Sequence, residues 1–398
     1  MSHNYSFDER QRKYGRSFEI TVWWALPAIL FFIFPLQPAS AHISKADTSS
    51  YSILPNFGYN SDIGFAGGGT VNRMVFDPDY EPYKSFLDFS IMATTKGFVK
   101  AQLSYDKPNI FGSRARSNIN LHGNRTLNDN YFGMGNNSGF NDNLWDDDYY
   151  NFESISLEAS IRTRHPVYQN NESRLDLLSL GGVSYNIPYD DESERLIGED
   201  RPLGFNGGWL NYIGTGVMWE NRDNEFAPTR GNQSRLEFYV MPELLLSDYQ
   251  MAIIYAETRQ YFNLGFLSNT TLALRGGFEQ AIGDAPYWKL PYIGGESTIR
   301  GYPYARFRGN SALFYNVEMR NWLVASEFYD VRLGVHAFSD AGRVFNDQGE
   351  LRQLLQDHKR TWGMGLALAP YNPDLILRMD YAFSSDMRRL YVGFGYLF

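Results

Sequence analysis

The sequence contains no cysteine, and beyond residue 41 it has no apolar run long enough to cross a bilayer as a helix. Without cysteine, the chain can form neither a disulfide framework nor a thiol nucleophile. Without a spanning helix, residence in a membrane would require a closed β-barrel, because a barrel is the other fold that satisfies every backbone polar group in lipid.

Catalytic and nucleic-acid-binding patterns are absent as well. The net charge of −9 argues against a general nucleic-acid binder. The sequence has no Gly-x-Ser-x-Gly elbow and no histidine pair at metal spacing, so we predict no enzyme, no metal and no cofactor. Acidic clusters at 146–148 and 190–192 lack the glycine-punctuated spacing of a calcium loop and are interpreted as solvated loop tips.

The amino-terminal region has the layout of a secretory signal peptide. Basic residues from Arg10 to Arg16 precede an apolar run over 20–36, and Ala39-Ser40-Ala41 supplies a small-residue cleavage site. Two prolines interrupt the apolar run, which disfavours the alternative of a single membrane helix. We therefore expect a signal peptide over 1–41, a short periplasmic segment over 42–52 and an outer-membrane β-barrel domain over 53–398.

What the sequence does contain is a long series of segments in which apolar and polar residues alternate. In 374–383, for example, Leu377 and Met379 share one face, whereas Arg378 and Asp380 lie on the other. A period of two is the signature of a β-strand. A secreted β-sandwich or jelly roll would show the same period with its apolar face inside. The number of strands and the charged composition of the polar face favour a barrel with lipid outside and a wet interior.

Strand counting supports closure of this barrel. Sixteen segments can be read between 54 and 398, an even number as bacterial barrels require. The longest connections, at 125–151, 188–208, 281–310 and 344–360, all follow odd-numbered strands, as the extracellular loops of outer-membrane barrels do. We predict an all-β fold, a sixteen-stranded antiparallel transmembrane barrel in the bacterial outer membrane, in contact with lipid and lipopolysaccharide.

A glycine-rich run lies in the predicted connection at 281–310 and reads Gly294-Gly295-Glu296-Ser297-Thr298-Ile299-Arg300-Gly301-Tyr302. It lacks the Gly-Lys-Ser/Thr ending of a nucleotide-binding loop, and it lies among short alternating strands instead of opening a helix. The run resembles the (Val/Ile/Leu)-Arg-Gly-(Phe/Tyr) tip of the sixth extracellular loop in the BamA/TamA superfamily of outer-membrane barrels, the bacterial surface antigen type.

This resemblance implies that the run is a lumen latch. In the family the sixth loop folds back into the barrel, and its arginine docks on acidic residues of the lumen. Arg300 is then the docking arginine, and Glu318 and Asp340 on the next two strands are its partners. Alternation independently turns both carboxylates inward, where a buried guanidinium requires paired acceptors; the alternative is an ordinary exposed loop arginine. The other latch residues are Gly294, Gly295, Ile299, Gly301 and Tyr302.

Two further motifs resemble the family. The stretch from Trp219 to Gly231 looks like its periplasmic turn after the eighth strand, although Glu220 stands where the family often has aspartate. At the carboxyl end, Tyr391, Gly393, Tyr396 and Phe398 are similar to the β-signal that barrel-assembly machinery recognises. This last strand would meet the first one, at Asn56–Tyr59, in a lateral seam.

The sequence departs from the family before the barrel, because only about a dozen residues separate Ala41 from the first predicted strand, too few for a periplasmic POTRA domain. One hypothesis is a BamA/TamA-type factor that assists insertion or translocation of unfolded outer-membrane or secreted client proteins, with periplasmic or POTRA-bearing partners. A second is a barrel retained as a pore or structural subunit of an envelope complex. A third, an outer-membrane phospholipase-like enzyme, lacks a visible nucleophile.

Overall fold

The computed structural model describes residues 48–77, 83–189, 194–265, 267, 269–326, 331–346, 354–370 and 375–398. The expected signal peptide over 1–41, residues 42–47 and the acidic cluster at 190–192 lie outside these residues. The first strand begins at Thr48, ahead of the barrel start expected at 53.

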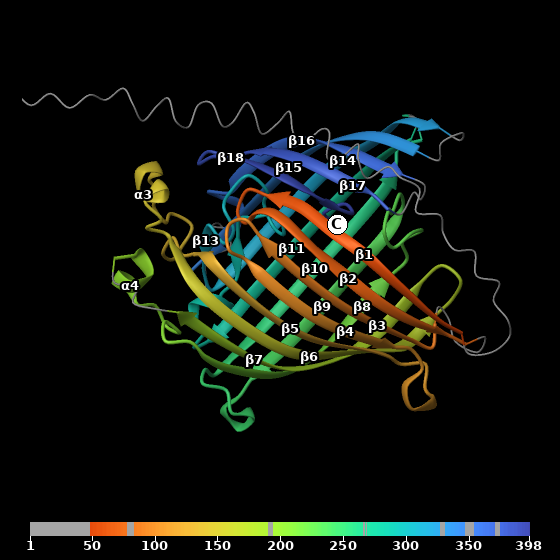
Figure 1. Cartoon of the computed structure of the whole chain (residues 1–398), viewed down its shortest axis with the longest axis horizontal. Helices are drawn as coiled ribbons and strands as arrows, with labels where there is room; N and C mark the ends of the chain where they lie inside the picture. The colour runs from red at the N-terminus through yellow and green to blue at the C-terminus, as the bar shows by residue number, and fades with distance from the viewer. Residues whose placement is uncertain are drawn as a thin grey trace, which may run out of the picture. The chain divides into compact units, whose positions relative to one another are not determined.

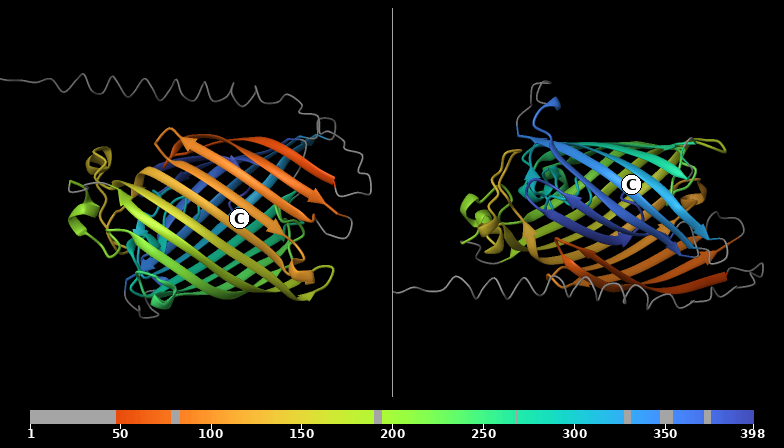
Figure 2. Two further views of the ribbon diagram at one scale, coloured as in Figure 1. Left: turned by 60° about the horizontal axis from the view of Figure 1, so that its bottom comes forward. Right: turned by 90° about the horizontal axis from the view of Figure 1, so that it is seen from above.

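Sixteen antiparallel strands close into a barrel, which confirms the fold predicted from the alternation (Figure 1). Neighbours in the ring follow chain order, and the last strand closes the ring against the first. The strands run obliquely around the barrel (Figure 2). They are β1 (Thr48–Asn60), β2 (Gly64–Phe76), β3 (Ser85–Thr94), β4 (Val99–Lys107), β5 (Arg116–Asn130), β6 (Asn151–Gln169), β7 (Arg174–Tyr189), β8 (Gly208–Glu220), β9 (Gly231–Met241), β10 (Met251–Asn263), β11 (Thr270–Gly283), β14 (Ser311–Ser326), β15 (Val331–Phe345), β16 (Lys359–Pro370), β17 (Leu377–Phe383) and β18 (Arg388–Phe394).

The alternation of the sequence becomes an apolar exterior and a polar interior. On β14, Val317 is 42% exposed and Met319 is 47% exposed, whereas Glu318 between them is 0% exposed. In a closed barrel the buried face of a strand is the inner face, so the charged residues line the interior. This is the arrangement that a lipid environment selects.

The shorter elements lie in the connections between barrel strands. Three connections that follow odd-numbered strands of the ring carry α3 (Asp142–Asp146), α4 (Leu196–Asp200) and the 3-10 turn η2 (Glu243–Leu245). The β11–β14 connection carries η3 (Tyr287–Lys289) and the two-stranded sheet of β12 (Tyr292–Ile293) and β13 (Phe307–Arg308), and the β4–β5 connection carries η1 (Ile110–Gly112). No helix within the described ranges is long and apolar enough to cross a membrane.

The last strand is shorter than the segment 389–398 predicted for it. β18 ends at Phe394, and Gly395 follows with a φ of 75°, in the left-handed region that an extended strand does not use. Phe398 is only 5% exposed and packs with Tyr261 and Ala273 on β10 and β11. The chain therefore leaves the barrel wall at Gly395 and turns inward.

Candidate functional site

The glycine-rich run lies at the tip of the β11–β14 connection. β12 pairs with β13, so the connection returns on itself and residues 294–306 form its tip. Gly294 and Gly295 have φ values of 113° and 89°. A Cβ at Gly294 would lie 2.4 Å from the carbonyl oxygen of Pro303, so only glycine fits this turn.

Arg300 contacts three carboxylates on three different strands. Its Nε donates to Oδ2 of Asp340 (2.8 Å) and its Nη2 to Oδ1 of the same residue (2.9 Å). Its Nη1 donates to Glu318 Oε2 (2.9 Å) and to Asp380 Oδ2 (3.0 Å). The guanidinium also lies over the ring of Phe338, 3.4 Å from its centroid. A planar, permanently charged group with five donors is suited to this several-fold contact.

Two further arginines and a histidine contact these carboxylates. Arg320 donates to Glu318 (2.8 Å) and Arg378 donates to Asp380 (2.7 Å). Nε2 of His336 lies 2.6 Å from Oδ1 of Asp380. With the loop arginine, three guanidinium groups thus face three carboxylates, all of them at most 4% exposed in their side chains. Burial of charge is tolerated when it is paired and hydrogen-bonded in this way.

The sequence predicted only part of this cluster. The structure places Arg300 against Glu318 and Asp340, the two partners named from the resemblance. It adds Asp380 and Arg378, for which neither the motif nor the resemblance predicted a role. Alternation had placed both on the polar face of their strand, but the pattern could not say that a loop some 80 residues away in the chain reaches them.

The rest of the latch packs against the β17–β18 hairpin. The Gly301 N–H donates to the Tyr391 hydroxyl (3.1 Å), and its carbonyl accepts from Ser384 Oγ (2.9 Å). The Tyr302 hydroxyl lies 2.9 Å from Ser385 Oγ. Ile299 is fully buried in the same apolar cluster as Tyr302. The latch therefore contacts the last two strands directly.

The same loop also contacts β1 and the β1–β2 turn. Glu296 accepts from Asn60 Nδ2 on β1 (3.2 Å) and, with its other oxygen, from Arg378 on β17. Asp62 accepts from the Tyr304 N–H (3.1 Å) and pairs with Arg389 on β18 (3.0 Å). Glu296 and Asp62, which we call the seam staples, thus join the two sides of the boundary between β1 and β18.

That boundary has little strand pairing. The β1–β18 register consists of two residue pairs, Tyr59 with Val392 and Asn60 with Tyr391.

The predicted seam residues lie on β18 and on the tail that follows it. Tyr391 is 1% exposed and points inward. At the inner end of the tail, the main-chain oxygen of Phe398 accepts from Arg320 Nη2 (2.6 Å). Gly393 remains within β18 with open space beside it, and Tyr396 lies on the tail, where Arg320 stacks over its ring at 3.9 Å.

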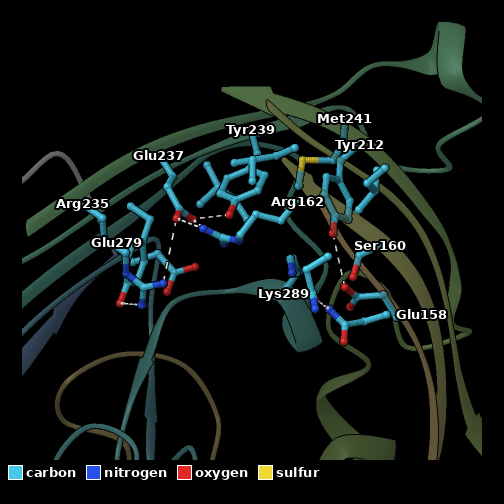
Figure 3. A pocket seen from close by; sticks show the side chains of 16 residues that line it. Glu158, Ser160, Arg162, Tyr212, Arg235, Glu237, Tyr239, Met241, Glu279 and Lys289 are labelled. Carbon is cyan, nitrogen blue, oxygen red and sulfur yellow. Dashed lines mark hydrogen bonds and ion pairs between the residues drawn. The ribbon is translucent and has the colours of Figure 1, made fainter. Parts of the chain in front are cut away.

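A polar cavity of about 420 Å³ lies elsewhere, along strands β5 to β11 (Figure 3). Arg162 donates to Glu237 (2.5 Å), which also accepts from the Tyr239 hydroxyl. Lys289, from η3 of the β11–β14 connection, faces the same space. Residues of both charge signs line this cavity, as expected for a wet barrel interior.

Full closure, an apolar exterior and a charged interior define a transmembrane β-barrel of the outer-membrane type. The chain belongs to the Omp85 superfamily, whose domain model matches residues 88–398. This confirms the predicted relationship to BamA/TamA-like barrels. Omp85 barrels are insertion and transport proteins of the Gram-negative outer membrane, so membership favours transport over the enzyme hypothesis.

Solved structures share the barrel fold. BamA from Haemophilus ducreyi, lacking POTRA domains 1–3, superposes with a TM-score of 0.59 at 15% identity, covering 88% of this chain and 71% of that one. CdiB from Escherichia coli gives a TM-score of 0.59 at 11% identity (92% and 68% covered). CdiB from Acinetobacter baumannii gives 0.52 at 12% identity (89% and 60% covered). No curated protein sequence gives a significant match.

Proposed function

We propose that this chain assists the insertion or translocation of polypeptides at the outer membrane, together with periplasmic partner proteins. The observation that carries the proposal is the contrast between two neighbouring strand boundaries. β1 pairs with β2 along all 13 of its residues, whereas its register with β18 consists of two residue pairs. Together with family membership, this contrast supports a barrel that opens laterally.

The mechanism follows from the hydrogen-bonding needs of a strand edge. Separating β1 from β18 exposes backbone donors and acceptors on both strands, and an extended client segment can pair with them by strand addition. A backbone hydrogen bond contributes about 1 kcal/mol net, so opening a two-pair seam costs far less than opening a full strand pairing. The turn at Gly395 shortens the last strand further.

The latch and the seam staples hold the closed state in this proposal. Arg300 fixes the loop on β14, β15 and β17, and Glu296 then reaches Asn60 on the other side of the seam. Opening requires the Asn60 contact and the Asp62–Arg389 ion pair to break. In the closed state, Arg300 thus holds the loop on β14, β15 and β17, while Glu296 of the same loop contacts β1.

Client delivery is assigned to partners. The described residues comprise the barrel and its connections. Because Omp85 relatives work with periplasmic POTRA partners and client polypeptides, we place the capture of unfolded outer-membrane or secreted client proteins on periplasmic or POTRA-bearing proteins that bind the barrel. Affinity purification of the intact chain from outer membranes, followed by mass spectrometry, is expected to recover such a protein.

Depletion of the protein tests the function itself. Quantitative profiling of the outer membrane after depletion is expected to show a several-fold loss of a subset of barrel or secreted proteins. Unchanged levels of all of them would contradict the assembly role.

The polar cavity favours a second candidate, a barrel kept as a pore or as a structural subunit of an envelope complex. Under this reading the loop restricts a wet interior, and Arg300→Ala raises or destabilises conductance across a planar bilayer. A variant with the conductance of the wild-type barrel would argue against a plugging role for the loop.

A further inference from the structure

The β9–β10 connection carries two leucines that stand almost fully clear of the protein. Leu244 is 90% exposed and Leu246 is 81% exposed. For comparison, Leu236 on the outer wall of β9 is 50% exposed. An isolated exposed leucine on a protein needs no explanation, but two on one short turn at this degree of exposure form a protruding apolar tip.

The turn that carries them is well defined. The Leu246 N–H donates to the Glu243 carbonyl (2.8 Å), which closes the η2 turn. Nδ2 of Asn211 on β8 donates to the carbonyls of Leu245 (2.7 Å) and Leu246 (3.2 Å). Leu246 has a φ of 59°, a conformation in which glycine or asparagine is usual and a bulky side chain is an outlier. The structure therefore presents an apolar side chain where the backbone favours a small or polar one.

The turn lies beside the outer rim of the apolar wall. The Asp248 N–H donates to the Trp209 carbonyl (3.0 Å), and the Asp248 carboxylate accepts from the Trp209 N–H (2.7 Å). Trp209, at the start of β8, is 47% exposed, and its ring centroid lies 4.6 Å from that of Tyr185. Such aromatic pairs are typical of the boundary between lipid and water. Ile213, on the same outer face, is 54% exposed and lies about 13 Å further along the strand at its usual rise.

We propose that this turn is a membrane anchor whose Leu244 and Leu246 side chains insert among the acyl chains of the outer leaflet. The tip continues an apolar wall that already faces lipid, and Figure 1 shows the turn (green, lower edge) projecting away from the barrel wall. The turn follows an odd-numbered strand, on the side of the long connections predicted to be extracellular. Transfer of leucine from water into lipid is favourable, whereas exposure to water would leave that gain unused.

The anchor lies opposite the seam. Around the ring, β9 is eight strands from β1 in either direction. Anchorage there holds the wall that stays paired and leaves the β1–β18 side without this attachment. The anchor itself does not depend on the proposed insertion activity, so each can fail alone.

Single-cysteine labelling provides the test, because the chain has no native cysteine. Leu244→Cys and Leu246→Cys are each labelled with an environment-sensitive nitrobenzoxadiazole dye, and the barrel is reconstituted into phosphatidylcholine vesicles. Leu355→Cys is the matched control, since Leu355 is 87% exposed. Its connection packs on the β5–β6 connection, where Asn136 Nδ2 donates to the Asp357 carbonyl (2.8 Å). Circular dichroism confirms that each variant is folded.

We expect blue-shifted emission at 244 and 246. We also expect lipids with a nitroxide on the acyl chain to quench these two positions several-fold more strongly than position 355. Quenching at 244 and 246 that is as weak as at 355 would place the tip in water and overturn the proposal. Quenching by headgroup nitroxides alone would overturn insertion into the acyl region. A blue shift that appears only as the protein-to-lipid ratio rises would assign the tip to contact with a second copy, and would also overturn it.

Discussion

Arg300 and Asp340 form a two-point ion pair in which both side chains are completely buried. Nε and Nη2 of the arginine donate to the two carboxylate oxygens at 2.8 and 2.9 Å, and the Arg300 N–H donates to the same carboxylate at 3.1 Å. The pair joins the tip of a loop to the inner face of β15. Because it has no access to solvent, its loss leaves uncompensated charge inside the barrel.

Replacing the loop arginine is therefore expected to destabilise the barrel. Arg300→Ala leaves three carboxylates without this cation and should lower the free energy of unfolding by about 3–5 kcal/mol. Arg300→Lys keeps the charge but not the planar guanidinium group, so its free energy of unfolding should lie between those of the wild type and Arg300→Ala. Urea titration of the reconstituted barrel, followed by tryptophan fluorescence, measures this. An alanine variant as stable as the wild type would refute docking of the loop.

Glu296→Gln is expected to loosen the seam without removing the latch. One carboxylate oxygen becomes an amide donor, which must then face the donors of Arg378 or Asn60. Cysteines introduced at Tyr59 and Val392, which are register partners, report closure through disulfide formation under mild oxidant. We expect Glu296→Gln to reduce the cross-linked fraction several-fold, while Glu243→Gln on the opposite wall leaves it unchanged. Equal cross-linking in both variants would show that Glu296 does not hold the seam closed.

Two glycines near the carboxyl end separate backbone conformation from packing. A Cβ at either Gly393 or Gly395 would meet nothing within 4 Å, but only Gly395 has a left-handed φ, of 75°. Gly395→Ala should therefore destabilise the native tail by about 1–2 kcal/mol, and Gly393→Ala should be close to neutral. The rate at which a water-soluble maleimide labels a single cysteine at position 398 measures whether the tail stays turned inward. Similar rates for the two alanine variants would show that the inward turn does not depend on Gly395.

The turn between β8 and β9 supplies a pH dependence. Burial alone would raise the pKa of Asp223, but hydrogen bonds from Thr229 and from the Arg230 N–H outweigh it and hold this pKa below its ordinary value. A depressed folded-state pKa means that the stabilisation is fully present above the unfolded pKa of about 4 and is lost as pH falls through the lower folded value. Between pH 6 and pH 2, Asp223→Asn should flatten part of the fall in unfolding free energy. A variant with the wild-type pH profile would contradict this role.

The sequence predicted the fold well because a barrel wall repeats one rule at every strand. Leu377 and Met379 against Arg378 and Asp380 already define the outer and inner faces of β17. The same rule misled at the carboxyl end, where Tyr396 and Phe398 continue the alternation although Gly395 has ended the strand. A period of two records which residues would share a face, but it does not record backbone dihedral angles.

The contacts of Arg300 with Glu318 and Asp340 were predicted because a motif and the alternation coincided there. Other contacts that join distant parts of the chain were not predicted. Asn60 and Glu296 are 236 residues apart, and nothing in either local pattern points to the other. The exposed Leu244 was missed for a related reason, because a short apolar stretch in a turn has no period from which its surroundings follow.

Locking the seam tests the central claim most directly. The Tyr59→Cys/Val392→Cys variant joins the register partners of β1 and β18 by a disulfide that reductant reverses. In cells depleted of the wild-type protein, we expect the oxidised variant to leave client levels in the outer membrane several-fold low, and reductant to restore them. Client levels that are normal with the seam fully cross-linked would show that the barrel does not work by lateral opening.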